Sequence, residues 1–298
     1  MITLESLKAL FGDERGEELF EYLTNKNKGG QNNAKGNVFE NFFAIYQIAK
    51  AHNEGCDKNN TLFSAQNFAF VDDLVVESLA ENINRYFQIK DTAALSWTTG
   101  THPIKDDFKV QKQLMTGTGI NTEYTMVVAK SEVYQTLVDS IPGDVNFVNV
   151  LQYDTETSIN SLVRKNAMLK QELVKMCALT NPDLDKLEAL GTILLGVWDG
   201  AEKKQISLNE LMDRSHRLNP NYIKGLNNKI SSRLEGIFKN IGGFSYEVQN
   251  GYIVWRFEPT DKGELEFAIG SAPYEQWEND VFNSNPTSFE ELETFLSA

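Results

Sequence analysis

The chain has 298 residues, a hydrophobic fraction of 41% and a formal net charge of −14 at pH 7. This length allows one large domain or two ordinary ones, each with its own core. No apolar run reaches the ~18 residues of a membrane-spanning helix, and the N-terminus lacks a secretory signal, so we predict a cytoplasmic protein without membrane contact.

The negative charge argues against nucleic-acid binding, because contacts with phosphates require clustered lysine and arginine. The acidic residues are unevenly distributed, since residues 263–298 contain no lysine or arginine. We predict that this segment is an acidic tail, which either masks a DNA site, contacts a partner or only keeps the protein soluble. The two cysteines, Cys56 and Cys177, lack neighbours at zinc spacing and are predicted to be reduced thiols.

Apolar spacing predicts the elements of the first half of the chain. The apolar residues within 3–24 follow helical spacing and predict a helix. Residues 24–36 are rich in Asn, Lys and Gly and predict a loop. Residues 37–52 carry the apolar stripe of a helix, with Asn37 as its N-cap. The elements predicted next are strands at 66–77 and 85–91, a helix at 101–114, a strand at 124–129, a helix at 131–140 capped by Ser131, and a strand at 145–151. This order predicts a mixed sheet flanked by helices.

After Asp154 the pattern becomes mainly helical. We predict helices at 155–178, 181–195, 208–217 and 221–241, then strands at 244–248 and 252–257 joined by Asn250-Gly251, a two-residue hairpin signal. Helix, helix, hairpin is the outline of a winged helix. The predicted domains are an α/β domain at 1–153, a helical connector at 154–200, and a winged-helix-like domain with the acidic tail at 201–298.

A winged-helix module binds either DNA or a protein partner, and the sequence leaves both open. The residues that would face DNA phosphates are Arg214, Arg217, Lys224, Lys229 and Arg233.

The most informative residues are two short polar groups on neighbouring predicted strands. Side chains alternate along a strand, so Gln88 and Lys90 point to the same face. If the preceding strand pairs with theirs, the acid pair Asp72-Asp73 meets an amide and an amine at one place. Oxygen ligands of this kind suit a hard cation such as Mg²⁺, which neutralises charge on a phosphate. Taken singly, an acid pair is typical of a strand start, and Gln-x-Lys of a polar strand face.

The motifs Gly36-Asn37-Val38-Phe39-Glu40, Asp72-Asp73 and Gln88-Ile89-Lys90 resemble those of the PD-(D/E)XK nuclease superfamily over residues 30–151. They resemble in particular the double-strand-DNA nuclease domains of bacterial anti-phage effectors, namely the nuclease half of CBASS effectors and Lamassu-type nuclease subunits. The resemblance implies a restriction-endonuclease-like fold and an endonuclease that depends on Mg²⁺ or Mn²⁺. The chain departs from the pattern because no proline precedes the acid pair and Gln replaces the commoner Glu.

The resemblance also implies a role for each residue of the site. Asp73 would be the central metal ligand, and Glu40 would reach the metal directly or through water. The amide oxygen of Gln88 and the backbone carbonyl of Ile89 would complete the ligand set. Lys90 would orient the attacking water and stabilise charge in the transition state.

Several alternatives stay open at this point. Asp72 is the alternative metal ligand to Asp73, and Gln47, on the helix face of Glu40, either supports the site or is a surface amide. The implied partners are double-stranded DNA and the sensor subunits of a defence complex, and self-association is left open. The alternatives in function are a stand-alone restriction-like endonuclease and a non-catalytic adaptor that keeps the nuclease fold.

Overall fold

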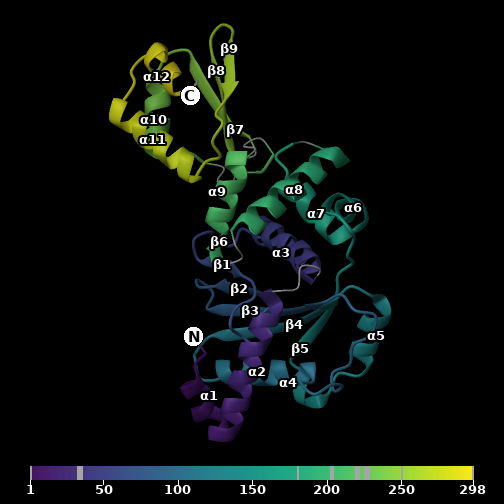
Figure 1. Ribbon diagram of the computed structural model, residues 1–298. Helices are drawn as coiled ribbons and strands as arrows, with labels where there is room; N and C mark the ends of the chain where they lie inside the picture. The colour runs from purple at the N-terminus through teal and green to yellow at the C-terminus, as the bar shows by residue number, and fades with distance from the viewer. Residues whose placement is uncertain are drawn as a thin grey trace.

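A computed structural model describes residues 2–31, 36–179, 181–201, 205–218, 222–224, 229–249 and 251–296. They form two units stacked end to end, a larger one built on a six-stranded sheet and a smaller one built on a three-stranded sheet (Figure 1). Within these ranges, no helix combines the length and the apolar character needed to cross a membrane.

The larger sheet has the strand order β5-β4-β3-β2-β1-β6. The pairs β3-β2, β2-β1 and β1-β6 are antiparallel, whereas the pairs β3-β4 and β4-β5 are parallel. The predicted mixed sheet flanked by helices is therefore confirmed. Leu74 pairs with Phe87, and this register places Asp73 opposite Gln88. The strands are β1 (Thr61–Ser64), β2 (Leu74–Ser78), β3 (Ile83–Lys90), β4 (Asn121–Val128), β5 (Val148–Gln152) and β6 (Ile206–Ser207).

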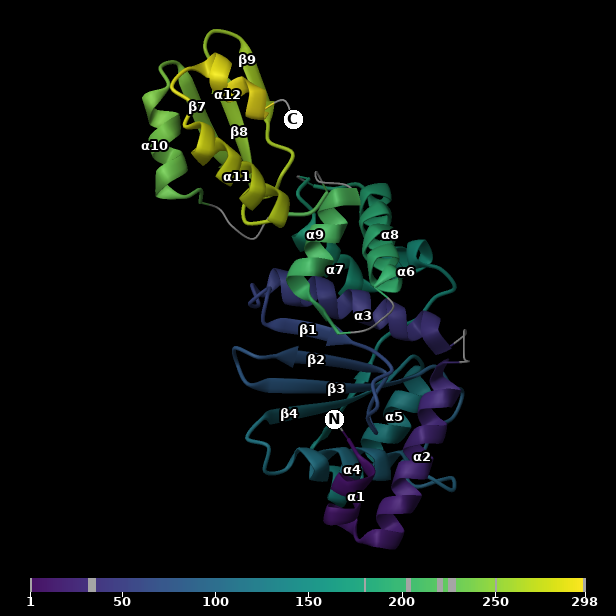
Figure 2. The same cartoon turned by 60° about the vertical axis from the view of Figure 1, so that its left-hand side comes forward.

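Helices cover both faces of this sheet (Figure 2). On one face α3 packs against the sheet, and α6 to α9 pack on α3 in the same core. On the other face lie α4 and α5, with α1 and α2 beside them. The helices are α1 (Leu4–Phe11), α2 (Asp13–Gln31), α3 (Gly36–Asn53), α4 (Ile104–Met115), α5 (Ser131–Asp139), α6 (Ile159–Lys165), α7 (Ala167–Met176), α8 (Leu184–Gly200) and α9 (Leu208–Leu218), and a 3₁₀ turn covers Gly143–Val145.

Alternation along β3 decides which side chains face which layer. Phe87 and Ile89 belong to the core under α3, and the Phe43 ring of α3 lies 5.2 Å from that of Phe87. Tyr86 belongs to the core on the opposite face. Gln88 and Lys90 follow Tyr86 at intervals of two and therefore project to the face opposite α3.

The smaller unit folds around its own core. Its three antiparallel strands have the order β7-β8-β9, and the core includes Leu234, Phe238, Ile253 and Trp277. Its elements are α10 (Ser232–Asn240), β7 (Phe244–Gln249), β8 (Tyr252–Phe257), β9 (Asp261–Glu264), α11 (Ala272–Ser284) and α12 (Phe289–Leu296).

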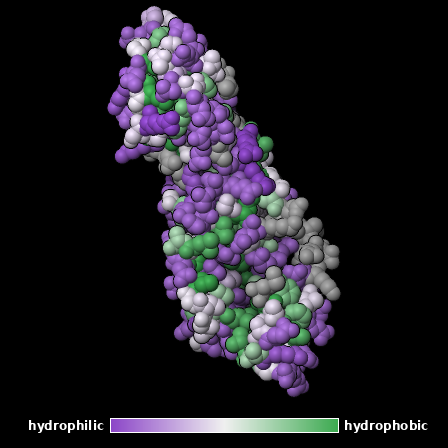
Figure 3. All heavy atoms as spheres, turned by 90° about the vertical axis from the view of Figure 1, so that its left-hand side faces the viewer, coloured by the Kyte–Doolittle hydropathy of each residue, from purple (hydrophilic) through white to green (hydrophobic). Residues whose placement is uncertain are grey.

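The acidic segment 263–298 is folded as far as residue 296, so its prediction as a tail is wrong. Trp277 and Val281 of α11 and Leu292 of α12 are buried in the smaller core. The acidic residues of these helices occupy the outward positions, and Glu290 is one of them. Apolar residues at helical spacing therefore fold the segment, and the carboxylates leave the smaller unit mostly hydrophilic on the face in Figure 3.

The order of elements in the smaller unit differs from the predicted helix, helix, hairpin. One helix, α10, precedes its three strands, and α11 and α12 follow them. The helix α9 belongs instead to the larger core through Leu208 and Leu211. Within the predicted helix 221–241, Ile223 forms a β-bridge with Cys177, while residues 225–228 lie outside the described residues. Asn250 of the predicted hairpin turn also lies outside them.

Three other predictions are wrong near the site and in the helical part. α2 continues to Gln31 where a loop was predicted from residue 24, and β2 begins at Leu74 instead of residue 66. The predicted helix 155–178 is two helices that meet at Asn166. The Asn166 side chain accepts a hydrogen bond from the N–H of Leu169, which caps α7 and explains the break.

Two predicted N-caps are also wrong. α3 begins at Gly36, so Asn37 lies inside the helix. Ser131 is the first helical residue of α5, whose N-cap is Lys130. The strand β1 was not predicted, because Thr61–Ser64 is too short to show a period.

Two buried histidines lie where the smaller unit meets the larger one. His52 of α3 and His216 of α9 are both buried, and the carbonyl oxygen of Ile223 lies 3.3 Å from His216 Nε2. The same oxygen accepts a hydrogen bond of 2.7 Å from the hydroxyl of Tyr252 in β8. Burial lowers the pKa of His52 to about 3 and that of His216 to about 4, with a further lowering by nearby Lys58.

We expect these histidines to make the protein acid-sensitive. Their folded pKa values lie below the unfolded value of about 6.5, so the unfolded state binds more protons and stability falls as the pH drops from about 6.5 toward 4. The expected loss in the free energy of unfolding is about 3 kcal/mol for each histidine. Urea unfolding from pH 7 to pH 4 measures it. The double variant His52→Gln, His216→Gln should flatten the dependence, and an unchanged slope in it would refute the assignment.

Candidate functional site

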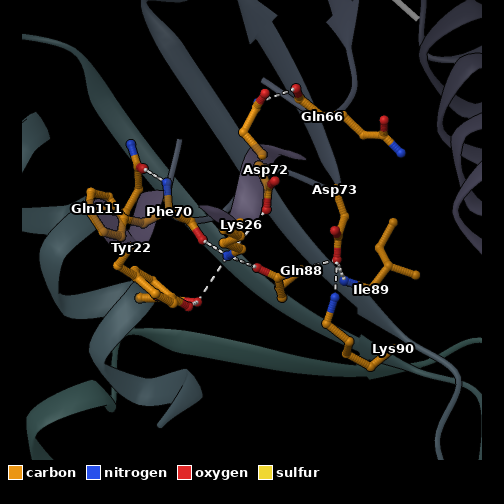
Figure 4. A network of polar contacts seen from close by, with 12 residues as sticks. Tyr22, Lys26, Gln66, Phe70, Asp72, Asp73, Gln88, Ile89, Lys90 and Gln111 are labelled. Atoms are coloured by element: carbon orange, nitrogen blue, oxygen red, sulfur yellow. Dashed lines mark hydrogen bonds and ion pairs between the residues drawn. The ribbon is translucent and has the colours of Figure 1, made fainter. Parts of the chain in front are cut away.

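Four parts of the chain converge at the start of β2 and the end of β3 (Figure 4). Helix α2 contributes Tyr22 and Lys26, the segment before β2 contributes the acid pair, β3 contributes Gln88 to Lys90, and α4 contributes Asp107 and Gln111. The acid pair is buried, and so are Gln88 and Asp107. A buried polar group requires a partner, so the contacts of each member define the site.

Asp73 faces β3. Its Oδ2 atom accepts a hydrogen bond of 2.7 Å from the backbone N–H of Ile89 and one of 2.9 Å from Lys90 Nζ. The same oxygen accepts a hydrogen bond from the side-chain amide nitrogen of Gln88. The structure therefore brings together Asp73, Gln88 and Lys90, which the sequence placed on two separate strands.

Asp72 faces the other way, toward α2. Its Oδ1 atom lies 3.3 Å from Lys26 Nζ, and its backbone carbonyl accepts a hydrogen bond of 2.7 Å from the N–H of Gln66. Burial raises the pKa of Asp72 to about 6; the Lys26 ammonium opposes this shift, and the Asp73 charge adds to it. The two neighbouring acids thus have different partners.

Lys26 was not predicted as a site residue. Its ammonium lies 2.9 Å from Asp107 Oδ2 and 3.4 Å from Gln88 Oε1, and it also donates to the carbonyl oxygen of Phe70. Its side chain is 18% exposed. Burial alone would lower the pKa of Lys26, but Asp72 and Asp107 outweigh it and raise the pKa above its ordinary value.

Helix α4 supports this ammonium from the far side. Asp107 Oδ2 also accepts a hydrogen bond of 3.1 Å from the Tyr22 hydroxyl, and burial raises the pKa of Asp107. The Tyr22 ring stacks on His102 with a centroid distance of 4.1 Å. One turn after Asp107, Gln111 accepts a hydrogen bond of 3.0 Å from the N–H of Phe70, which fixes the segment before β2.

A small apolar cluster holds α2 in this position. Leu19 and Leu23 pack against Phe70 and against Val110 of α4. Residues 19, 22, 23 and 26 follow helical spacing and lie on one face of α2. That stripe was the signal in the sequence that would have found Lys26, but the Asn-Lys-Gly composition after residue 24 indicated a loop instead.

The other predicted residues of the metal site come from α3. Glu40 is half-buried in the first turns of α3, which covers the sheet face opposite Gln88 and Lys90. Gln47 is half-buried on the same helix. The three hydrogen bonds to Asp73 described above all come from β3, and Ile89 contributes its backbone N–H.

The basic residues predicted to contact DNA are spread over two units. Arg214 forms an ion pair with Glu210 on α9, and Arg233 of α10 donates to the carbonyl oxygen of Phe282. Both are therefore engaged within the protein. The set comprises Arg214 and Arg217 on α9, Lys224 and Lys229 between α9 and α10, and Arg233 on α10.

The acid pair fits a hard divalent cation in donor type and in charge. Within the described residues, no three His, Cys, Asp or Glu side chains are arranged to hold a metal, but the predicted set needs only two carboxylates beside an amide and a carbonyl oxygen. The buried Oδ1 atom of Asp72 has Lys26 Nζ at 3.3 Å as its ion-pair partner, and it accepts no further hydrogen bond within the described residues. Three carboxylates face two ammonium groups, so the cluster has an excess of negative charge.

Comparisons with known proteins give little guidance on function. No protein-family model matches the chain, and no curated protein matches it. Two structures of an Acinetobacter baumannii Cap4 receptor with a SAVED/CARF domain, one with 2′3′3′-cAAA and one with 3′3′3′-cAAA, are similar to part of it. Each is 10% identical and covers 62% of this chain, with TM-scores of 0.40 and 0.41. The matches span 45% and 48% of those chains, and at these TM-scores the likeness supports no conclusion on function.

Proposed function

We propose that the chain is a metal-dependent endonuclease that hydrolyses phosphodiester bonds in DNA. The observation that carries the proposal is the meeting of Asp73, Gln88 and Lys90 at one end of two paired strands, with Lys90 Nζ 2.9 Å from Asp73 Oδ2. The elements α3, β2, β3, α4, β4, α5 and β5 follow one another in the order that the sequence predicts, with β1 as an additional strand.

The side chains at this place suit phosphodiester hydrolysis. Asp73, Gln88 and Glu40, with Asp72 as the alternative, would hold Mg²⁺ or Mn²⁺, which neutralises charge on the phosphate and activates water. The Lys90 side chain is 39% exposed, so substrate can reach its ammonium. Lys90 would hold the attacking water by a hydrogen bond and stabilise negative charge as it develops on the phosphate.

Partner-dependent delivery reconciles this chemistry with the acidic surface. A net charge of −14 disfavours a strong intrinsic affinity for DNA. The motif resemblance implies an anti-phage effector under the control of sensor subunits, and such a nuclease must be silent until it is triggered. A stand-alone enzyme would instead need a basic cleft of its own, while a non-catalytic adaptor would not need the Asp73–Lys90 contact.

Cleavage of plasmid and linear DNA tests the proposal. Purified protein, alone and with co-purified partners, is incubated with supercoiled circular and linear duplex DNA in Mg²⁺, Mn²⁺ or EDTA. We expect both forms to be cut in metal and neither in EDTA, since an endonuclease needs no free end. Cleavage by the isolated chain at full rate would favour the stand-alone enzyme. Intact DNA in every condition, partners included, would favour the adaptor.

A further inference from the structure

The ammonium of Lys26 lies among side-chain and backbone oxygens from three parts of the site. It lies 3.3 Å from Asp72 Oδ1 and donates to the carbonyl oxygen of Phe70 (Figure 4). It also lies 2.9 Å from Asp107 Oδ2. Carboxylate and carbonyl oxygens are also the preferred ligands of Mg²⁺ and Mn²⁺. The oxygens that hold Lys26 are therefore of the kind that would hold a metal.

The orientation of Gln88 connects Lys26 to Asp73. The Gln88 amide oxygen faces Lys26 Nζ at 3.4 Å, while its amide nitrogen donates to Asp73. An ammonium can only donate, so Lys26 favours the rotamer in which the oxygen of Gln88 points to α2. A divalent cation in the place of the Lys26 ammonium would meet the same oxygen of Gln88.

We propose that Lys26 is a built-in counterion that shares its oxygens with the divalent cation of the site, so that Lys26 and the cation exclude each other. The proposal rests on the proposed function, because it assumes that the acid pair binds a metal. Two positive groups at one set of oxygens repel, and the binding of one therefore weakens the binding of the other. Lys26 would act as the counterion of Asp72 and Asp107 while the site holds no metal.

A purely structural role for Lys26 makes a different prediction. If the ammonium only anchors α2 to the segment before β2, its removal destabilises the fold and leaves the affinity for cations unchanged or lower. If it competes, its removal raises that affinity, because Asp72 and Asp107 lose their counterion. The affinity for a cation is therefore the measurement that separates the two roles.

Titration of the EDTA-treated protein with Mn²⁺ by calorimetry, together with thermal unfolding in Mn²⁺ and in EDTA, provides the test. Lys26→Met keeps the length of the side chain and removes its charge. We expect its Kd for Mn²⁺ to be at least about tenfold lower than that of the wild type. We also expect Mn²⁺ to raise its unfolding temperature by more than that of the wild type, because ligand binding stabilises the folded state in proportion to affinity.

The control variant is Lys109→Met, which removes the same charge from α4. Lys109 is exposed and paired with Asp144 at 2.9 Å. Its removal tests whether net charge alone alters cation binding, and we expect a wild-type Kd. An equal gain in affinity in both variants, or no gain in Lys26→Met, would overturn the proposal.

A second measurement uses the wild type and does not depend on the folding of a variant. Limited acetylation with an amine-reactive ester, followed by mass spectrometry of peptides, reports the reactivity of each lysine. Lys26 should be protected in EDTA and become several-fold more reactive in Mn²⁺, while Lys109 should react equally in both. Equal protection of Lys26 in both buffers would refute displacement.

The outcomes also separate this proposal from the proposed function. Binding of Mn²⁺ to the wild type and DNA cleavage, without a change in Lys26→Met or in the reactivity of Lys26, would overturn the competition and leave the nuclease standing. Tight Mn²⁺ binding by Lys26→Met without any DNA cleavage would support the competition and overturn the nuclease. Absence of Mn²⁺ binding in both proteins would overturn both.

Discussion

Replacing Lys90 by alanine is expected to reduce the rate of metal-dependent DNA cleavage by about 10²–10³-fold, the loss typical for removal of one preorganised donor. Lys90 is held 2.9 Å from Asp73 Oδ2, so its ammonium is fixed in place before substrate arrives. Removal of the side chain also leaves the buried Asp73 with one hydrogen bond fewer. Single-turnover cleavage of a labelled duplex in Mg²⁺ measures the effect.

The matched control for Lys90→Ala is Lys109→Ala, an exposed lysine of α4 outside the acid pair, which should cleave like the wild type. Asp73→Asn should lose activity together with Lys90→Ala, because Asp73 is the common partner of Gln88, Ile89 and Lys90. Wild-type cleavage in Lys90→Ala, with folding verified by circular dichroism, would show that the catalytic site lies elsewhere.

Replacing Phe43 by alanine is expected to lower the free energy of unfolding by about 3–5 kcal/mol, the usual cost of removing a buried phenylalanine. Phe43 is 0% exposed and joins α3 to the sheet. Its ring lies 5.2 Å from the rings of both Phe87 and Tyr153, in edge-on geometry. The variant would leave a cavity between two layers that are too large to close around it. Urea unfolding at pH 7 measures the change.

The control on the same helix is Val38→Ala, since Val38 is 41% exposed. We expect its free energy of unfolding to change by less than about 0.5 kcal/mol, as for most surface substitutions. Equal losses in the two variants would mean that α3 does not depend on Phe43 for its packing against β3.

The sequence predicted the elements of the larger unit well where their apolar residues recur at a regular spacing. The helix of Glu40, the strand of Gln88 and Lys90, and the elements from residue 104 to residue 152 appear in the predicted order, with ends that differ by a few residues. Those segments bury one continuous face or a whole strand, so their apolar pattern reports the packing directly. The errors fall where composition competed with packing, as in the second half of α2 and in residues 263–298.

Residues 263–298 show this competition most clearly. Their charge indicated a solvated tail, yet Trp277, Val281 and Leu292 bury enough apolar surface to fold α11 and α12 onto the smaller sheet. The charged residues describe only the exposed side of these helices. Their number does not show whether the segment also has a buried apolar side.

The sequence by itself determined that Gln88 and Lys90 share a face, because alternation along a strand is local. It also supplied the acid pair close to the start of a neighbouring strand. Only the tertiary structure decided that Asp73 turns to β3 while Asp72 turns to Lys26, and that Asp107 joins them from α4. Lys26 and Asp107 are 81 residues apart in the chain. Their contact depends on the packing of α2 against α4, which no local pattern encodes, and the buried charges then fix each other's partners because an unpaired charge there would be too costly.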